Sequence, residues 1–163
     1  MQTVYLLLGS NLGDRNAYLK EALQQLETSV GRVIRTSSVY ETQSWGVANQ
    51  PDYLNQVVEM ETLFLPDKIL EKTQFIEENL YRERTKKWDS RTIDIDVLFF
   101  GTEIIDLPNL KIPHLQIQNR LFTLVPLNEL IPNFVHPILN KTIQELRQEV
   151  SDELLVKKIA FIN

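Results

Sequence analysis

Arg91-Thr92-Ile93-Asp94-Ile95-Asp96-Val97-Leu98-Phe99-Phe100 organises the rest of the chain, and its β-branched and aromatic residues predict a strand. Side chains alternate between the two faces of a strand, so the predicted core-facing set is Ile93, Ile95, Val97 and Phe99. The opposite face would carry Thr92, Asp94 and Asp96. Two residues of strand rise place the Cα atoms of the two aspartates about 6–7 Å apart on that face.

The two aspartates offer the oxygen ligands that Mg²⁺ prefers, and they could hold one ion or a pair about 3.5–4 Å apart. Five cationic side chains lie within the ten residues that lead into this strand: Arg82, Arg84, Lys86, Lys87 and Arg91. A hard metal beside a cluster of cations suits a nucleotide polyphosphate. The alternative is an exposed strand face with solvated charges, and the residues alone leave both interpretations open.

Length and composition predict one soluble globular domain spanning residues 1–163, with 43% hydrophobic and 24% charged residues. The net charge of −5 argues against a nucleic-acid partner, and the local positive charge favours a small anionic ligand. The absence of cysteine excludes disulfides, and two histidines make a zinc site improbable. The chain begins without a signal-peptide pattern and has no apolar run of membrane-spanning length, so we expect a cytoplasmic protein.

The order of elements predicts an α+β fold with a ferredoxin-like βαββαβ core, an antiparallel sheet with helices on one face. The expected elements are a strand Thr3–Leu8, a helix from Asp14 to Gly31, a strand Arg32–Glu41, a strand Tyr53–Phe64, a helix from Pro66, and the strand that contains Asp94. A short helix near Phe122–Leu130 and a final helix opened by the capping box Thr142 to Glu145 follow.

Some candidate binding residues have two readings. Tyr53, with Asn55 two residues on, could stack against and hydrogen-bond a flat heterocycle, or the pair could simply be surface residues. Trp45 lies in the non-periodic loop Thr42–Pro51 and is either a buried anchor or a ligand-facing residue. The loop Gly9–Asp14 lacks the spacing and the lysine of a P-loop, so we expect a structural turn there.

Seven pieces of the sequence carry a family resemblance, and they occur in order across roughly residues 4–147. They are Leu8-Gly9-Ser10-Asn11-Leu12-Gly13-Asp14, Tyr40-Glu41-Thr42, Gln50-Pro51-Asp52-Tyr53-Leu54-Asn55, Ile76-Glu77, Arg82-x-Arg84, Trp88-x-x-Arg91-Thr92-Ile93-Asp94-Ile95-Asp96, and Pro113-His114 followed by Asn119-Arg120-x-Phe122. In these pieces the chain resembles the 6-hydroxymethyl-7,8-dihydropterin pyrophosphokinase family of folate biosynthesis.

The resemblance implies a transferase that moves pyrophosphate from ATP to the pterin hydroxymethyl group and leaves AMP. It implies that Asp94 and Asp96 hold two Mg²⁺, with Arg82 and Arg91 completing the catalytic group. It further implies a monomer that binds ATP first.

The same resemblance implies the binding residues. The triphosphate would be held by Arg82, Arg84, Lys87, Arg91, His114 and Arg120. The rest of the ATP site would include Gln74, Glu77, Trp88 and Val97. The pterin ring would lie between Tyr53 and Phe122, with its edge bonded by Asn55 and by the backbone of Thr42–Trp45. For His114, the residues alone favour a structural loop histidine.

Four places depart from the usual family pattern, and the first is Gln43-Ser44, which lacks the prolines often found there. Lys87 stands where arginine is common, which replaces a bidentate fork by a point charge. Asp89-Ser90 replaces a Gly-Pro pair, and Leu115 follows His114 where a tyrosine can sit. We expect these departures to affect affinity and loop motion more than the reaction.

Two other functions remain as alternatives. A Mg²⁺-dependent phosphohydrolase or nuclease could use Asp94 and Asp96, but it would leave Tyr53, Asn55 and Phe122 without a task. A non-catalytic ferredoxin-like module, including RNA binders, would need exposed aromatic residues and a basic face on its sheet. The acidic pair and the negative net charge of this chain disfavour that module.

Overall fold

The computed structural model describes residues 1–43, 52–80 and 92–159. In this part of the chain, β1 (Gln2–Ser10) is an interior strand of a six-stranded sheet, between β4 (Tyr53–Thr62) and the edge strand β5 (Asp94–Phe100). Both pairings of β1 are antiparallel. All residues from Val4 to Ser10 are buried, so both faces of this strand must be covered by other elements.

The outer side of β4 pairs with β2 (Arg32–Thr36) and then with β3 (Val39–Thr42), and β3 pairs with β8 (Val156–Ile159). This order confirms the ferredoxin-like core, to which β8 adds an edge strand. The predicted strand Arg32–Glu41 is divided in two at Ser37. The Ser37 hydroxyl accepts the Val57 N–H at 2.9 Å, and the Ser37 N–H donates to the Val57 carbonyl at 2.9 Å.

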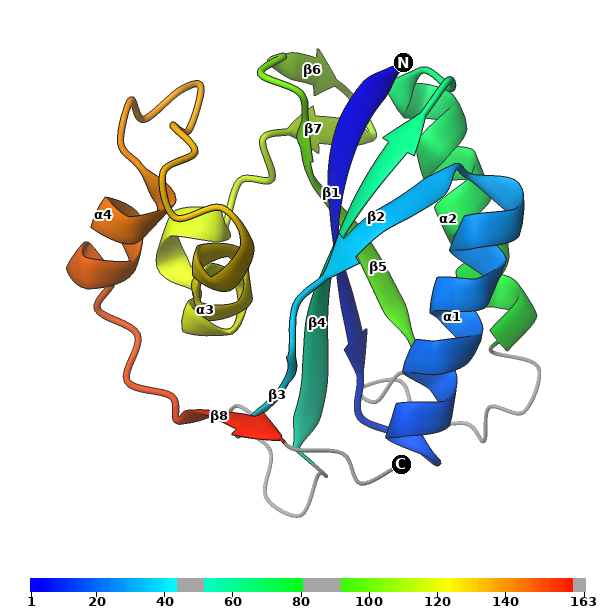
Figure 1. The fold of residues 1–163 in the computed structure, drawn as a ribbon, viewed down its shortest axis with the longest axis horizontal. Helices are drawn as coiled ribbons and strands as arrows, with labels where there is room; N and C mark the ends of the chain where they lie inside the picture. The colour runs from blue at the N-terminus through cyan, green and yellow to red at the C-terminus, as the bar shows by residue number, and fades with distance from the viewer. Residues whose placement is uncertain (44–51, 81–91, 160–163) are drawn as a thin grey trace.

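Two helices cover one face of the sheet, α1 (Arg15–Ser29) and α2 (Pro66–Leu80), as Figure 1 shows. The predicted N-cap of α1 is confirmed, because the Asp14 side chain accepts the Ala17 N–H at 3.0 Å. The apolar faces of both helices pack on the sheet and form the larger hydrophobic core. Its buried residues include Val4, Leu6, Leu8, Leu19, Leu26, Val58, Met60, Ile69, Ile76, Ile93 and Ile95.

The other face of the sheet is also covered, so the prediction of helices on one face alone is wrong. The 3₁₀ turn η2 (Ile117–Asn119) leads into α3 (Leu121–Leu130), and α4 (Ile143–Glu149) follows. The reason lies in β1, where Tyr5 and Leu7 on this face are hydrophobic as well as Val4, Leu6 and Leu8 on the other. A second core forms there from Tyr5, Leu7, Val57, Leu98, Phe99, Leu124, Leu127 and Leu146.

A β-bulge in β5 changes the predicted alternation. Tyr5 pairs with Phe99 while Leu6 pairs with Val97, so the register passes over Leu98. As a result Val97 packs on the α1 side of the sheet, whereas Leu98 and Phe99 both pack on the α3 side. The prediction that Phe99 shares a face with Val97 is therefore wrong, but the two aspartates precede the bulge and keep their predicted face.

The remaining elements are a hairpin of β6 (Ile105–Leu107) and β7 (Leu110–Ile112), and the capping box of α4. The capping box is confirmed: the Glu145 N–H donates to the Thr142 hydroxyl at 3.1 Å, and the Thr142 N–H donates to Glu145 at 3.0 Å. Within the described residues, none of the helices combines the length and the apolar character needed to cross a bilayer.

Candidate active site

A cleft of about 620 Å³ opens on the α3 side of the sheet, a volume typical of small-molecule sites. Four strands of the sheet, β1, β3, β4 and β5, form its floor, and the start of α3 and a segment near the C-terminus form its walls. It is lined by Leu7, Gly9, Thr42, Gln43, Tyr53, Asn55, Asp94, Asp96, Gln116, Asn119, Arg120, Phe122, Ser151, Asp152 and Leu154.

Seven of the residues predicted to bind substrates or metal meet in this cleft. They are Thr42, Tyr53, Asn55, Asp94, Asp96, Arg120 and Phe122. The strands bring the first five together, because the ends of β3, β4 and β5 lie side by side with the end of β1. The helix α3 then brings Arg120 and Phe122 from the second half of the chain.

Gly9 lies between the two functional strands. Its Cα partners are Asn55 on β4 and Asp94 on β5. A Cβ atom on residue 9 would lie 2.9 Å from the Asn55 Nδ2 atom, closer than real Cβ atoms approach a neighbour. Glycine at this position therefore gives the Asn55 amide its space. The sequence alone predicted Gly9 only as part of a turn.

Two buried polar atoms of the cleft have no partner among the described residues: Asn55 Oδ1 and Thr42 Oγ1. Both side chains are almost fully buried, and the Asn55 amide donates only a long bond of 3.3 Å to the Leu8 carbonyl. A buried polar atom without a hydrogen bond costs about 1–3 kcal/mol. These two atoms are thus placed to bond a polar ligand in the cleft.

Asp94 and Asp96 project from β5 into the cleft, and both are half-buried. Between them, Ile95 faces the core, and its N–H donates to Glu77 Oε2 at 2.9 Å, which joins α2 to β5. The described part of the chain contains no cluster of three or more histidine or acidic side chains suited to a metal. A two-carboxylate site still fits Mg²⁺, which commonly completes its coordination with water and substrate phosphates.

His114 lies near the acidic pair. Burial lowers the pKa of its imidazole; the nearby Asp96 carboxylate opposes this, while Arg120 lowers the pKa further. The His114 backbone N–H donates to the carbonyl of the bulged residue Leu98 at 3.0 Å, and this bond holds His114 beside β5. The Gln116 N–H donates to His114 Nδ1 at 3.1 Å, so the neutral ring carries its proton on Nε2.

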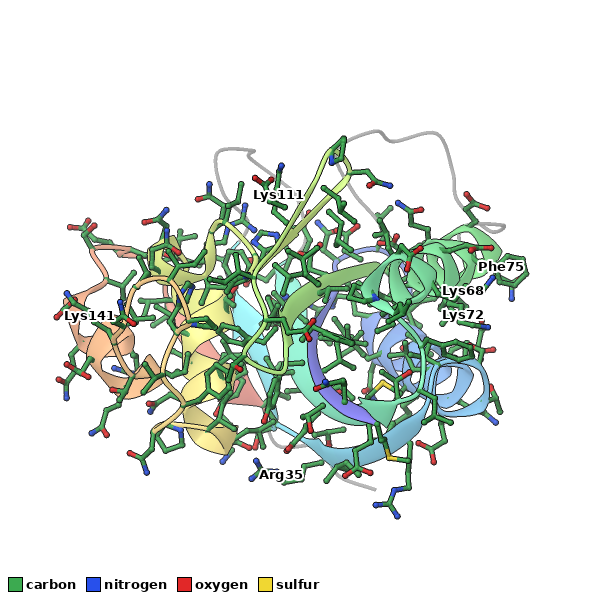
Figure 2. All side chains as sticks on the ribbon, turned by 90° about the horizontal axis from the view of Figure 1, so that it is seen from above. Arg35, Lys68, Lys72, Phe75, Lys111 and Lys141 are labelled. Carbon is green, nitrogen blue, oxygen red and sulfur yellow. The ribbon has the colours of Figure 1, made fainter. Side chains whose placement is uncertain are left out.

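Several predicted residues lie elsewhere. Gln74 is exposed on α2 beside Lys68 and Lys72, which Figure 2 shows near Phe75 at the outer side of that helix. The Val97 side chain is in the core on the opposite face of the sheet from the cleft. The predictions for Trp45, Arg82, Arg84, Lys87, Trp88 and Arg91 fall outside the described residues.

The structure adds lining residues that sequence reasoning missed. Gln116 and Asn119 flank His114 and Arg120, and the Asn119 amide donates to Gln116 Oε1 at 3.0 Å. Ser151, Asp152 and Leu154 reach the cleft because β8 pairs with β3. Only the place of Asn119 in the family pattern gave a signal, and residues 151–154 carried none.

Comparison with known proteins identifies the relatives of this chain. The family model described as HPPK, 7,8-dihydro-6-hydroxymethylpterin-pyrophosphokinase, matches residues 5–132. The 2-amino-4-hydroxy-6-hydroxymethyldihydropteridine pyrophosphokinase of Aquifex aeolicus is 41% identical over 149 residues, which are 91% of this chain and 92% of that protein. The enzyme of the same name from Haemophilus influenzae is 39% identical over 158 residues, 96% of this chain and 98% of that protein.

Among solved structures, a Plasmodium falciparum HPPK-DHPS matches with a TM-score of 0.76 at 20% identity. The match covers 91% of this chain but only 43% of that longer one, and at this identity it supports the fold alone. The fold, the family model and the two enzymes agree with one another and with the resemblance noted in the sequence. The chain therefore belongs to the 7,8-dihydro-6-hydroxymethylpterin-pyrophosphokinase family.

Proposed function

We propose that this chain transfers pyrophosphate from ATP to the hydroxymethyl group of 6-hydroxymethyl-7,8-dihydropterin, releasing AMP, as a step of folate biosynthesis. The observation that carries the proposal is a single cleft with two different ends. One end has an acidic pair beside a histidine and an arginine, and the other has aromatic rings beside unpartnered polar atoms. The names of the Aquifex and Haemophilus relatives support the same reaction.

The aromatic end suits a pterin, which is flat and has polar atoms along one edge. Tyr53 comes from β4 in the floor and Phe122 from α3 in a wall, so their rings line different sides of the cleft and could enclose the pterin ring. Asn55 Oδ1 would accept a hydrogen bond from an amino group or a ring N–H. The Thr42 hydroxyl would donate to or accept from the same edge.

The acidic end suits the triphosphate together with its metal. Arg120 and the Nε2–H of His114 would donate to phosphate oxygens, and the predicted cations of residues 82–91 would add to them. Asp94 and Asp96 would hold the Mg²⁺, because two carboxylates plus phosphate oxygens form a donor set that this ion accepts. When bound, Mg²⁺ neutralises phosphate charge and lowers the pKa of the attacking hydroxyl.

The protein's own contribution is alignment and charge. Phosphoryl-type transfer depends mainly on positioning and on stabilising the charge that moves, so no protein base is required. Arg120 would lie close to both substrates, because its guanidinium carbon is 5.4 Å from the centre of the Phe122 ring, which lines the proposed pterin pocket. It can therefore hold the phosphates while it packs against the wall of the pterin pocket.

The proposal extends to the working form of the protein. Both hydrophobic cores pack on one sheet, which supports a single domain over residues 1–163. We propose a cytoplasmic monomer that acts on two small molecules and not on nucleic acid, in line with the net charge of −5.

The test is AMP release measured with and without the pterin in wild-type protein and in the variants Asp94→Asn and Asp96→Asn. Wild type should release AMP only when both substrates and Mg²⁺ are present. Each variant should lose more than about tenfold in kcat, or about 1.4 kcal/mol. Glu103→Gln, an exposed acid just beyond β5, is the matched control and should keep full activity. Nucleotide hydrolysis without pterin would instead support the phosphohydrolase.

A further inference from the structure

One wall of the cleft comes from a segment beyond the match to the family model, which ends at residue 132. Ser151, Asp152 and Leu154 line the cleft directly after α4. This 151–156 segment continues into β8, so it runs from the end of a helix to the edge of the sheet. It lies next to Phe122 and Thr42, two residues of the proposed pterin pocket.

Asp152 makes two hydrogen bonds that determine the course of this segment. Its Oδ2 accepts the Leu121 N–H at 3.0 Å, and its Oδ1 accepts the Leu154 N–H at 2.9 Å. Each carboxylate oxygen thus has a backbone donor. The first bond reaches across 31 residues to α3, and the second stays within the 151–156 segment.

The bond to Leu121 supplies what α3 lacks locally. Arg120, the N-cap residue, makes no side-chain capping bond, and the first turn of α3 has no acidic residue. The first N–H groups of a helix need an acceptor, and a carboxylate there also interacts favourably with the helix dipole. Asp152 therefore caps α3 at the residue that separates Arg120 from Phe122.

The other end of the segment is joined to the sheet that forms the floor of the cleft. The Gln43 N–H donates to the Leu155 carbonyl at 3.4 Å, and Val156 then pairs with Thr42 in the β3–β8 ladder. The segment consequently connects the floor that carries Thr42 with the wall that carries Phe122. The connection is short, since only three residues separate Asp152 from Val156.

From this geometry we infer that Asp152 is a positioning residue for the pterin pocket, a role that rests on the proposed function. It fixes the first turn of α3 against the 151–156 segment and so sets the place of the Phe122 ring relative to Thr42. Both oxygens of Asp152 accept backbone N–H groups, and its negative charge would be repelled by the phosphates of ATP, so we place its role in the pterin pocket. The effect of its loss should therefore fall on the pterin more than on ATP.

The kinetic test compares Asp152→Asn with Glu153→Gln, its exposed neighbour, which lines no part of the cleft. The amide of asparagine presents a donor to one of the two backbone N–H groups, so one capping bond is lost. Loss of a helix cap typically costs about 1 kcal/mol, and we expect the KM for pterin to rise by about five- to tenfold. The KM for ATP should change by less than about twofold on the same reasoning, and Glu153→Gln should match wild type.

A second measurement uses unaltered protein and does not depend on the folding of a variant. Amide hydrogen exchange is followed at Leu121 and Leu154, with the Glu145 amide of α4 as the reference. Pterin bound with Mg²⁺ and a non-hydrolysable ATP analogue should slow exchange at Leu121 and Leu154, but not at Glu145.

The outcomes separate the two proposals. If wild-type protein releases no AMP in response to pterin, the proposed function fails. If wild type is active but Asp152→Asn keeps the pterin KM of Glu153→Gln, the role of Asp152 is overturned. A parallel rise of both KM values, or equal protection of all three amides, would also overturn it, because either result indicates a general effect on the fold.

Discussion

Gly9→Ala tests how closely the pterin end of the cleft is fitted. The new Cβ would lie 2.9 Å from Asn55 Nδ2 and 4.0 Å from the Leu54 carbonyl oxygen, so only the amide has to move. Moving it breaks a long hydrogen bond to Leu8, which costs about 0.5–1.5 kcal/mol. Replacing a glycine inside a strand by alanine stabilises the fold by about 0.5–1 kcal/mol. The free energy of unfolding should therefore change by less than about 1 kcal/mol.

Binding of the pterin should change much more than stability. The displaced amide no longer presents Oδ1 to the ligand, and the loss of one hydrogen bond in a buried site costs about 1–3 kcal/mol. This corresponds to a Kd that rises by about five- to 150-fold. Urea unfolding gives the first quantity, and calorimetric titration of the pterin in the presence of an ATP analogue and Mg²⁺ gives the second.

The control is a double-mutant cycle with Asn55→Ala, which removes the atom that the new methyl group at position 9 would contact. In that background Gly9→Ala should have little further effect on Kd, because the space is already free. If Gly9→Ala weakens binding equally with and without Asn55, the steric reasoning is wrong. An unchanged Kd in the single variant would refute the role of the Asn55 amide itself.

Two further predictions concern stability. Gly31→Ala should lower the free energy of unfolding by about 3 kcal/mol, because the new Cβ would overlap the Glu61 backbone carbonyl. The pterin Kd of the folded variant should be unchanged, and calorimetric titration would check this. His136 has a pKa lowered by burial, so the unfolded chain binds its proton first as pH falls below about 6.5. Wild-type stability in urea should therefore decrease from pH 7 to pH 5, with a shallower slope in His136→Gln; identical slopes would contradict this.

Local signals allowed the core of the fold to be predicted from the sequence. The alternation in β5 placed Asp94 and Asp96 correctly because no irregularity precedes them on that strand. The cap at Asp14 likewise depends on residues close in the chain. The phase of Phe99 was wrong because the bulge at Leu98 arises from pairing with β1, which no local pattern encodes.

The site was predictable to a lesser degree and for the same reason. Tyr53 and Asn55 had no decisive signal of their own, and the family pattern brought them into the prediction together with Phe122. Gly9 matters through an atom 46 residues away in the chain, and Asp152 through the first N–H of α3. Contacts of this kind depend on the folded arrangement, so composition and periodicity could not reveal them.

The place of Gly9 between Asn55 and Asp94 has a consequence for how the reaction geometry is maintained. Neighbouring strands are held about 4.8 Å apart by their hydrogen bonds, so β4 and β5 are about 10 Å apart across β1. Under the proposed function, this fixed interval separates the pterin's polar edge from the metal-bound phosphates. The hydrogen-bonded sheet then fixes the distance between the two substrates, and the sequence of the surrounding loops can change without altering that distance.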